Sequence, residues 1–402
     1  MSGLNPAADQ LLPAPSRETL IILLGQIAFG LLAMTICLPS MPSWLDSFNE
    51  PQARVQLTFS AYLVGFALTQ LIYGPLSDNF GRRRVLVAGL VIGVLGSLAG
   101  AMASSLNELI AARALQGAGT CAGMVVGRAI IQDTFAAATR TRVMAFVGVV
   151  MGSCPPLGTL IGGQLHVYFG WRSTFIVIAA LGIALVVASL MGLAPGRPLS
   201  RRRSLLGMAS SYVSLVREPS YLSYCLVAGF ASGAFYIFLG MAPTVLGSYG
   251  VGPASIGWYI LMVPGSYIAG NALTARLAQS VSGKHLMFVG QALTVTGVVL
   301  VWVLALSDFF HPLAVALPLM LLGFGHGLLM PPTLSGLVGV IPALAGAGAA
   351  LAGMMQQALG AVGSYSAGFV DSSNAAGMAG LMLIFTLIGL AAQIPLATHK
   401  RR

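Results

Sequence analysis

Charged residues are the scarcest class in this chain. Asp, Glu, Lys and Arg make up 7% of the 402 residues, and only ten residues are acidic, whereas a soluble protein carries about 25% charge. Hydrophobic residues reach 57%, and the mean hydropathy is +0.88. This composition excludes an ordinary soluble domain. It predicts an all-α polytopic membrane protein, because roughly a dozen helices of ~20 residues with short loops fit into this length.

Cysteine and catalytic motifs are also sparse. The four cysteines (Cys37, Cys121, Cys154 and Cys225) lie singly inside apolar runs, without metal-ligand or redox spacing. The sequence has no Gly-x-x-x-x-Gly-Lys-Ser/Thr loop, which excludes an ATP-driven pump within this chain. No acid lies deep in an apolar run to support a nucleophile, so an intramembrane enzyme is disfavoured. We expect no cofactor, no metal and no catalytic residue.

The apolar runs form two sets of six, which predicts twelve transmembrane helices. The first set is Thr19–Met41, Gln56–Tyr73, Val85–Ala103, Leu106–Asp133, Val143–Phe169 and Ser173–Leu193. The second set is Tyr221–Ser248, Ser255–Leu277, Leu286–Leu306, Leu313–Pro331, Ala347–Val370 and Met378–Ala397. A half-length shift lays the polar hinge 75–84 on 276–285, as expected for pseudo-symmetric bundles. The predicted parts are a tail (1–18), a bundle (19–193), a basic linker (194–219), a second bundle (220–397) and a basic tail (398–402).

The net charge of +10 is unevenly distributed. The cations of alternate loops and the C-terminus are Arg82–Arg84, Arg140, Arg142, Arg197, Arg201–Arg203, Arg217, Arg276, Lys284 and Lys400–Arg402. Lys and Arg concentrate in cytoplasmic loops, so we expect a multi-pass protein of the bacterial inner membrane with both termini cytoplasmic. The same placement argues against nucleic-acid binding. Met1–Glu18 has no signal-peptide pattern.

A polar hinge follows the second run, with the sequence Gly-Pro-Leu-Ser-Asp-Asn-Phe-Gly-Arg-Arg-Arg at residues 74–84. Gly74 and Pro75 are predicted to end one helix, and Gly81 to allow a turn that other residues resist. Asp78 can accept hydrogen bonds from the next helix start. The spacing resembles the loop 2–3 signature of the major facilitator superfamily of secondary transporters. That resemblance implies two six-helix bundles that rock around a midplane cavity.

The fourth span narrows the resemblance. Arg-Ala-Leu-Gln-Gly-Ala-Gly at residues 113–119 is similar to the signature of drug/proton antiporters. Residues 127–135 and 162–172 resemble the bicyclomycin- and chloramphenicol-resistance (Bcr/CflA) branch. The resemblance implies a coupling role for Arg113. It also implies a latch between loop 2–3 and the fourth span that holds the outward-facing gate shut. The gating candidates are Gly74, Asp78, Gly81, Arg82, Arg83, Arg128 and Asp133.

Two residues are candidates for coupling, and each has an alternative. A buried arginine costs about 2.5–3.5 kcal/mol on insertion scales, so Arg113 must face a cavity, a partner or a substrate. Otherwise it snorkels to the external interface. His326 is a histidine deep in a predicted span, and an unperturbed pKa near 6.5 lets histidine exchange protons. Its alternative is a hydrogen-bonded packing role. For Arg128 and Asp133 the alternative is a weak surface charge cluster.

The sequence departs from the resembled branch at two positions. Thr35 stands where an aspartate is usual, and Thr159 where the antiporter motif has proline. Without a deep carboxylate, and with Arg113 as a fixed charge, we expect a neutral or anionic amphipathic substrate. Polar and aromatic residues at membrane depth are the candidates for binding it: Gln26, Thr35, Tyr62, Gln116, Phe235, Tyr236, Tyr267, Asn271, Gln356 and Gln357. Helix–helix hydrogen bonding is the alternative role for each.

These observations predict a secondary active transporter that works by alternating access, with 19–193 rocking against 221–397. Drug efflux by proton antiport is the leading function. The alternative is uptake or export of a siderophore or similar metabolite, including transport as a facilitator without proton antiport, because the hinge does not encode direction. The expected partners are a small-molecule substrate, protons and the lipid bilayer. We expect a monomer.

Overall fold

The computed structural model describes residues 17–135, 137–194 and 205–398, and every regular element within them is a helix. Parts of the predicted tails and linker (1–16, 195–204 and 399–402) lie outside the described residues, Arg201–Arg203 among them. In chain order the helices are α1 (Arg17–Thr35), η2 (Leu38–Ser40), α2 (Met41–Phe48), α3 (Gln52–Phe80), α4 (Arg82–Met102), α5 (Leu106–Thr134), α6 (Ala137–Phe169), α7 (Arg172–Gly192), α8 (Leu205–Val216), α9 (Pro219–Ser248), α10 (Pro253–Leu277), α11 (Gly283–Leu306), α12 (Pro312–Val340), η3 (Pro342–Leu344), α13 (Ala345–Ala367) and α14 (Ala375–Thr398).

Twelve long helices correspond to the twelve predicted spans, which confirms the all-α fold class. Within the described ranges, ten segments are long and apolar enough to cross a membrane. The other two long helices, α10 and α13, have 25 and 23 residues and are long enough, but they carry more glycine and polar side chains. The first predicted span is broken: α1 ends at Thr35, and the chain continues through the short helix η2, which contains Pro39.

The predicted helix end at Gly74 and Pro75 is wrong. Helix α3 continues through Pro75 to Phe80, because a membrane helix tolerates proline where neighbouring groups satisfy the backbone. Gly81 does form the predicted turn. Its φ is 94°, a conformation that side-chain-bearing residues resist, and it ends α3 and begins α4. Arg82 therefore starts its helix directly beside the last turn of α3.

The predicted end of the tenth span at Pro331 is also wrong, since α12 continues to Val340. Pro331 has no N–H, and this leaves the Gly327 carbonyl without its usual helical partner. Thr274 Oγ1 on α10 lies 2.9 Å from that carbonyl and 3.0 Å from the Gly270 carbonyl of its own helix, so its hydroxyl hydrogen is shared between the two. A hydrogen bond from a neighbouring helix thus replaces the one that proline removes, and the helix persists.

The helices pack as two groups of six, which are joined by two seams. The first group is α1 and α3–α7, and the second is α9–α14. Close packing in the first group depends on small residues: a Cβ on Gly117 of α5 would lie 2.1 Å from the Tyr62 carbonyl of α3. Between the groups, α3 packs on α13 and α6 packs on α10.

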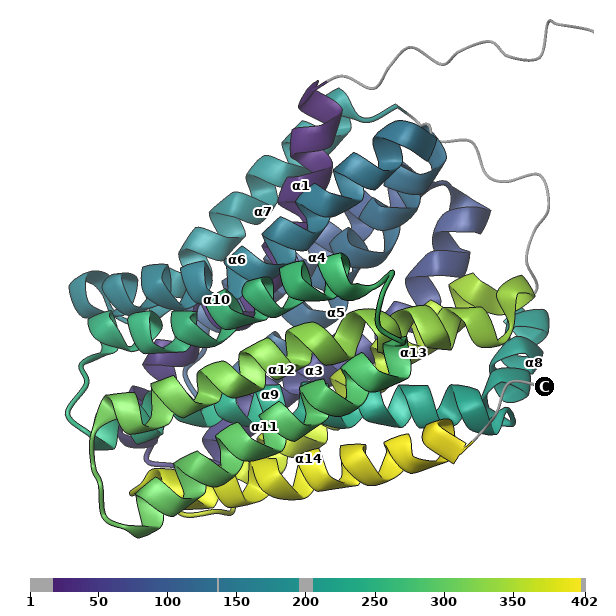
Figure 1. Cartoon of the computed structure of the whole chain (residues 1–402). Coiled ribbons are helices and arrows are strands. Elements are labelled where there is room, and N and C mark those ends of the chain that lie inside the picture. Colours follow the sequence, from purple (N-terminus) through teal and green to yellow (C-terminus); the bar gives the residue numbers. More distant parts are fainter. Residues whose placement is uncertain (1–16, 136, 195–204, 399–402) are drawn as a thin grey trace, which may run out of the picture.

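The backbones of the two groups come into close contact at one end. A Cβ on Gly163 would lie 2.3 Å from the Pro253 carbonyl, and one on Gly368 would lie 2.4 Å from Ala53 Cα. We call the other end the basic end, because the turn at Arg82, the end of α10 and the start of α11 lie there with their cations. In Figure 1, α1 and α7 diverge from α8 and α13 as they approach the basic end.

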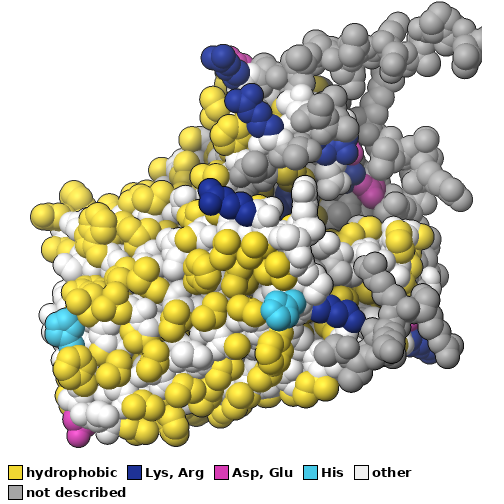
Figure 2. Space-filling model, in the orientation of Figure 1, with side chains coloured by type: hydrophobic (Ala, Val, Ile, Leu, Met, Phe, Trp, Pro, Cys, Tyr) yellow, Lys and Arg dark blue, Asp and Glu magenta, His cyan; other side chains and the backbone are white. Residues whose placement is uncertain are grey.

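Between its two ends the described outer surface is largely apolar. Large hydrophobic side chains are exposed along the second group, where Figure 2 shows them as a broad band, with Lys and Arg along its upper and right-hand sides. Helix α8 was not anticipated within the predicted linker. It packs against α9 and α13 and buries Leu215, so part of the linker is a structured element at the basic end.

Candidate functional site

A cavity of about 310 Å³ lies between the two helix groups. The first group contributes residues of α1 and α6, and the second contributes residues of α9, α10, α12 and α13. The lining consists of Leu31, Met34, Gly148, Met151, Gly152, Pro155, Ser232, Phe235, Tyr236, Val263, Pro264, Tyr267, Asn271, Leu322, Gly323, His326, Met330, Leu334 and Gln356. It runs from Met34, beside the end of α1, to Leu334, in the last two turns of α12, and so extends toward the basic end.

The lining is largely apolar, with a few neutral polar groups and one histidine. None of these lining residues is Asp, Glu, Lys or Arg. Ser232 Oγ donates to Gln356 Oε1 at 3.2 Å, which joins α9 to α13. His326 is 5% exposed, and its Nε2 has no hydrogen-bond partner among the described residues. An apolar pocket with few, well-placed polar groups is the usual form of a small-molecule site.

Five of the predicted binding residues line this cavity: Phe235, Tyr236, Tyr267, Asn271 and Gln356. Phe235 and Tyr236 form a tilted contact with ring centroids 5.8 Å apart. The Tyr236 ring also meets the Phe59 ring of α3 edge-on, with centroids 6.0 Å apart. That second contact crosses from one helix group to the other. The aromatic wall of the cavity is therefore in direct contact with both groups.

The other five predicted binding residues lie outside the lining. Gln26 donates to Ser189 Oγ at 2.7 Å, and Thr35 donates to its own helix at the Leu31 carbonyl, 3.0 Å away. Gln357 is half-buried and lies outside the lining. Tyr62 and Gln116 contact Arg113. At membrane depth a polar side chain often satisfies a neighbouring helix, and a sequence does not separate that role from ligand binding.

Sequence reasoning missed the apolar part of the lining. Leu31, Met34, Met151 and Met330 look like any lipid-facing residue in the sequence, because lipid and an apolar cavity favour the same side chains. One signal was available in the fifth span, where Gly148 and Gly152 precede Pro155. Small and helix-bending residues mark places where a membrane helix lines a space or a close contact.

Arg113 lies wholly buried on α5 and faces the end of α1. Its Nη1 donates to the Ala33 carbonyl at 2.8 Å, and its Nη2 donates to the Met34 carbonyl at 3.2 Å. These are carbonyls of the last turn of α1, where a helix carries partial negative charge. Its guanidinium carbon also lies 4.4 Å from the centroid of the Tyr62 ring. Carbonyl dipoles and an aromatic face balance the arginine where no carboxylate is in contact.

A hydrogen-bonded chain holds this arginine in place. Arg113 Nη1 also donates to Gln116 Oε1, and Gln116 Nε2 donates to Ser97 Oγ on α4 at 2.8 Å. Tyr62 donates to the Gly30 carbonyl at 2.6 Å, and its hydroxyl lies 2.7 Å from Thr120 Oγ1. The side chain thus does not snorkel to the surface. It does not line the cavity either, but it reaches the backbone of Met34, whose side chain does.

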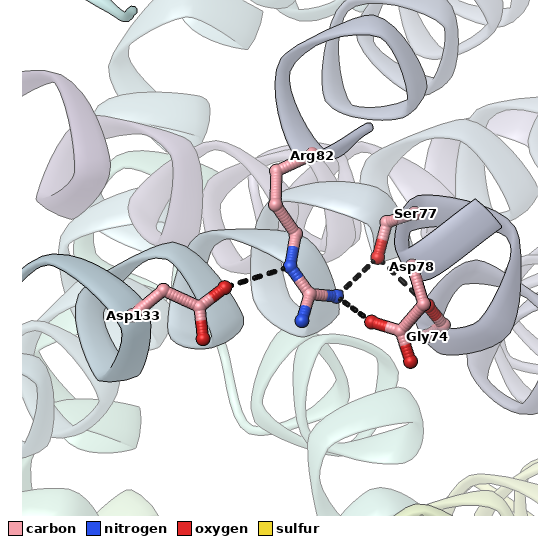
Figure 3. Close-up of polar contacts among 5 residues, drawn as sticks. All are labelled: Gly74, Ser77, Asp78, Arg82 and Asp133. Atoms are coloured by element: carbon pink, nitrogen blue, oxygen red, sulfur yellow. Dashed lines mark hydrogen bonds and ion pairs between the residues drawn. The ribbon is translucent and has the colours of Figure 1, made fainter. Parts of the chain in front are cut away.

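The hinge forms an ion-pair cluster around Arg82, which is shown in Figure 3. Arg82 Nη1 lies 2.5 Å from Asp78 Oδ1 and donates to Ser77 Oγ at 2.6 Å. Arg82 Nε donates to Asp133 Oδ2 at 3.0 Å. One guanidinium therefore ties the end of α3 to the end of α5, and both helices belong to the first group.

The remaining gating candidates have separate contacts. Arg83 Nη2 donates to the Leu190 carbonyl in the last turn of α7, a position that favours a cation. Arg128 does not join the Arg82 cluster as the latch hypothesis supposed, but donates to Met151 Sδ on α6 at 2.7 Å. Because Met151 lines the cavity, Arg128 lies directly behind its wall. A Cβ on Gly74 would meet no atom within 4 Å.

The sequence profile of the Major Facilitator Superfamily matches residues 23–364. The chain belongs to this superfamily. The predicted resemblance is thereby confirmed, and the protein is a multi-pass membrane protein and a secondary transporter, not an enzyme.

Several relatives that are named as drug-resistance proteins or drug transporters match this superfamily member over most of its length. It is 28% identical over 386 residues to multidrug resistance protein D of Escherichia coli, covering 94% of this chain and 96% of the relative. It is 32% identical over 294 residues to the multidrug transporter MdfA of Yersinia pestis, covering 72% and 71%. It is also 26% identical over 283 residues to the bicyclomycin resistance protein homolog of Haemophilus influenzae, covering 68% and 71%.

Solved structures support the same superfamily fold. The crystal structure of a D-xylose-proton symporter superposes with a TM-score of 0.75 at 15% identity, covering 94% of this chain and 96% of the other. At that identity the likeness concerns the fold alone. It agrees with the two packed groups of six helices described above.

Proposed function

We propose that this superfamily member exports a small amphipathic compound, neutral or anionic, by alternating access, in exchange for protons. The observation that carries the proposal is the central cavity. It is lined from both helix groups, it is apolar with a few neutral polar groups, and no acidic residue lines it. The names of the relatives, multidrug resistance protein D and multidrug transporter, support a drug-like substrate.

The charge of the substrate follows from the lining. A cation in this cavity would lose its hydration and gain no carboxylate, which is costly in a low-dielectric site. Thr35, at the position where an aspartate is usual, instead donates to its own helix. A neutral compound meets no such penalty, and an anionic one would be favoured over a cation by the positive charges of Arg113, which contacts the Met34 carbonyl, and of Arg128, which contacts Met151.

Coupling is assigned to Arg113 and His326. Arginine keeps its proton in proteins, so Arg113 acts as a fixed charge that holds the end of α1 against α5. His326 is the residue in the lining that can gain a proton and a positive charge. Protonation of His326 would add charge to the apolar cavity itself, so a proton and a neutral substrate would compete there, as exchange requires.

Gating is assigned to the hinge and its neighbours. Asp78, Arg82 and Asp133 would hold the ends of α3, α4 and α5 together, so that the first group moves as one body. Gly74 and Gly81 would allow this segment to bend, and Arg83 would bind α4 to α7. Arg128 would couple movement of Met151 in the cavity wall to α5. We place the basic end and both termini on the cytoplasmic side of a bacterial inner membrane, and we propose a monomer. The described arrangement would then face the cytoplasm.

The test is an accumulation assay in cells that express the transporter. Export lowers the internal concentration of the substrate and raises resistance, whereas uptake of a siderophore or similar metabolite does the reverse. The pH gradient and the membrane potential are then collapsed separately. If neither collapse changes the flux, proton antiport is wrong and a facilitator remains, an alternative that the lack of a carboxylate in the cavity favours.

A further inference from the structure

A second groove lies on the outer surface of the second helix group, away from the transport cavity. It is formed by the first two turns of α11 and the last turns of α14, at the basic end, and has a volume of about 380 Å³. Farther from the basic end the two helices are joined directly: Gln291 Nε2 of α11 donates to the Thr386 carbonyl of α14 at 2.7 Å. The groove is therefore the place where the two helices separate.

The walls of the groove are apolar and face outward. Phe288 is 59% exposed and Ile394 is 61% exposed, on a surface of the protein that meets lipid. The floor is formed by Met287 and Leu396, which are buried in a cluster with Leu329. Apolar walls that open onto the hydrocarbon suit an acyl chain, because its burial there exposes no polar backbone.

The end of the groove nearest the basic end carries positive charge. Lys284 and His285 begin α11, and the start of a helix adds partial positive charge. Ser282 caps this helix by accepting a hydrogen bond from the His285 N–H at 3.3 Å. No acidic residue is among those that line the groove. An anionic group is the natural occupant of such an end.

A buried amide side chain lines the same space. Gln393 lines the groove and is only 6% exposed, yet its Oε1 has no hydrogen-bond partner among the described residues. A buried acceptor without a partner is costly, so most such groups in proteins are satisfied. The occupant therefore needs a hydrogen-bond donor close to its anionic group. The ammonium of a zwitterionic head group would be repelled by Lys284, whereas a hydroxyl would not.

We propose that this groove binds an anionic glycerophospholipid with a hydroxyl on its head group. The phosphate lies against Lys284 and the start of α11, the hydroxyl donates to Gln393 Oε1, and an acyl chain lies along Phe288 and Ile394. Such a lipid would fasten α11 to α14 where the two helices otherwise part. The site does not depend on the identity or direction of the transported substrate.

Native mass spectrometry of the purified full-length transporter tests this proposal, with phosphatidylglycerol, phosphatidylethanol and phosphatidylcholine as probes. Phosphatidylethanol has the same charge as phosphatidylglycerol but lacks the hydroxyl, so the pair isolates the contact with Gln393. The variants are Lys284→Gln, Gln393→Leu and the control Arg276→Gln. Arg276 is an exposed cation at the same end of the molecule, in the last turn of α10, and does not line the groove.

The wild-type protein is expected to retain one phosphatidylglycerol in preference to both other lipids. Lys284→Gln should weaken its retention about fivefold, the effect of one cation near an anionic lipid, while Arg276→Gln leaves it unchanged. Gln393→Leu should remove the preference over phosphatidylethanol. Equal retention of the three lipids by the wild-type protein would overturn the proposal whether or not the variants fold, as would equal losses in Lys284→Gln and Arg276→Gln.

Discussion

Gln56 of α3 ties the first helix group to two helices of the second. Its Nε2 donates to the Gly240 carbonyl of α9 at 2.9 Å, and its Oε1 accepts from Ser364 Oγ of α13 at 3.4 Å. The side chain is buried, and it lies at the end where the groups meet, opposite the basic end. Among the residues that the structure describes, this closure is made by neutral hydrogen bonds with no ion pair across it, so it can open without separating charges.

Replacing Gln56 with Leu should open this end. The change removes two buried hydrogen bonds, each worth roughly 1 kcal/mol, and should shift the population toward the open form about tenfold or more. Spin labels on Ser47 of α2 and Asp308 at the end of α11 would report the shift as a longer distance. Gln26→Leu is the matched control, since Gln26 bonds within the first group. An unchanged distance distribution in Gln56→Leu would contradict this role.

Arg113→Lys should impair transport although the charge is kept. Lysine lacks the planar fork that reaches the Ala33 and Met34 carbonyls together, and hydrogen bonds from charged groups contribute about 1.5–3 kcal/mol, so flux in proteoliposomes should fall at least ~tenfold. Arg172→Lys is the control. Arg172 also donates to a carbonyl, that of Ala103 at 3.0 Å, and lies over Trp171, but it is exposed. Equal flux in both variants would argue against a positioning role for Arg113.

Asp78→Asn should reduce transport while membrane insertion stays normal. The substitution removes the charge that pairs with Arg82 across the Gly81 turn and loosens α3 from α4. Asp133→Asn should have a smaller effect, because the Asp133 side chain is 53% exposed and that of Asp78 only 12%. Flux assays with matched amounts of inserted protein would separate the two. Normal flux in Asp78→Asn would remove the hinge from the proposed gate.

His326→Gln should remove the pH dependence of substrate binding. With histidine in place, a neutral ligand should bind less tightly as the pH falls, because a protonated imidazole makes the apolar cavity charged and exchange for protons requires that proton and substrate compete. Glutamine keeps a polar side chain of similar size but does not take up a proton. Titration calorimetry over a pH series from acidic to neutral, with an identified substrate, would measure the change. The same pH slope in both proteins would assign His326 to packing.

Thr274→Val should destabilise the second helix group by about 1–2 kcal/mol, because it leaves the Gly327 carbonyl without a partner. Adding Pro331→Ala should recover most of that loss, since alanine restores the N–H that can bond within α12. Thermal unfolding of the two single variants and the double variant would give the coupling energy directly. Additive losses would show that the Thr274 hydroxyl does not compensate for Pro331.

The fold could be predicted from the sequence because each helix carries its own evidence. A span is a local property, a long apolar run between polar loops, and proton or substrate chemistry does not alter it. Two of the predicted helix ends failed at proline. The sequence shows that Pro75 and Pro331 remove an N–H, but whether another helix supplies a donor, as Thr274 does, depends on packing between distant segments.

The candidate site was predictable only in part for the same reason. Polar residues at membrane depth are conspicuous in a sequence, yet Gln26 and Gln116 bond to neighbouring helices while Asn271 and Gln356 face the cavity. The side to which each one points depends on how its helix is rotated, and apolar patterns that meet both lipid and protein leave that rotation undetermined. The partner of Asp133 likewise is Arg82 at the start of α4, which only the packing of α4 on α5 reveals.

The lining of the transport cavity is unevenly shared between the two halves of the chain. The second half supplies four of its six helices, whereas Arg82, Arg113 and their partners belong to the first. In the proposed mechanism, the choice of substrate would depend mainly on the second half, whereas the buried and paired arginines lie in the first and the coupling candidate His326 lies in the second. Substitutions after residue 219 that spare His326 would then change which compound is accepted without disturbing the charged residues before residue 194.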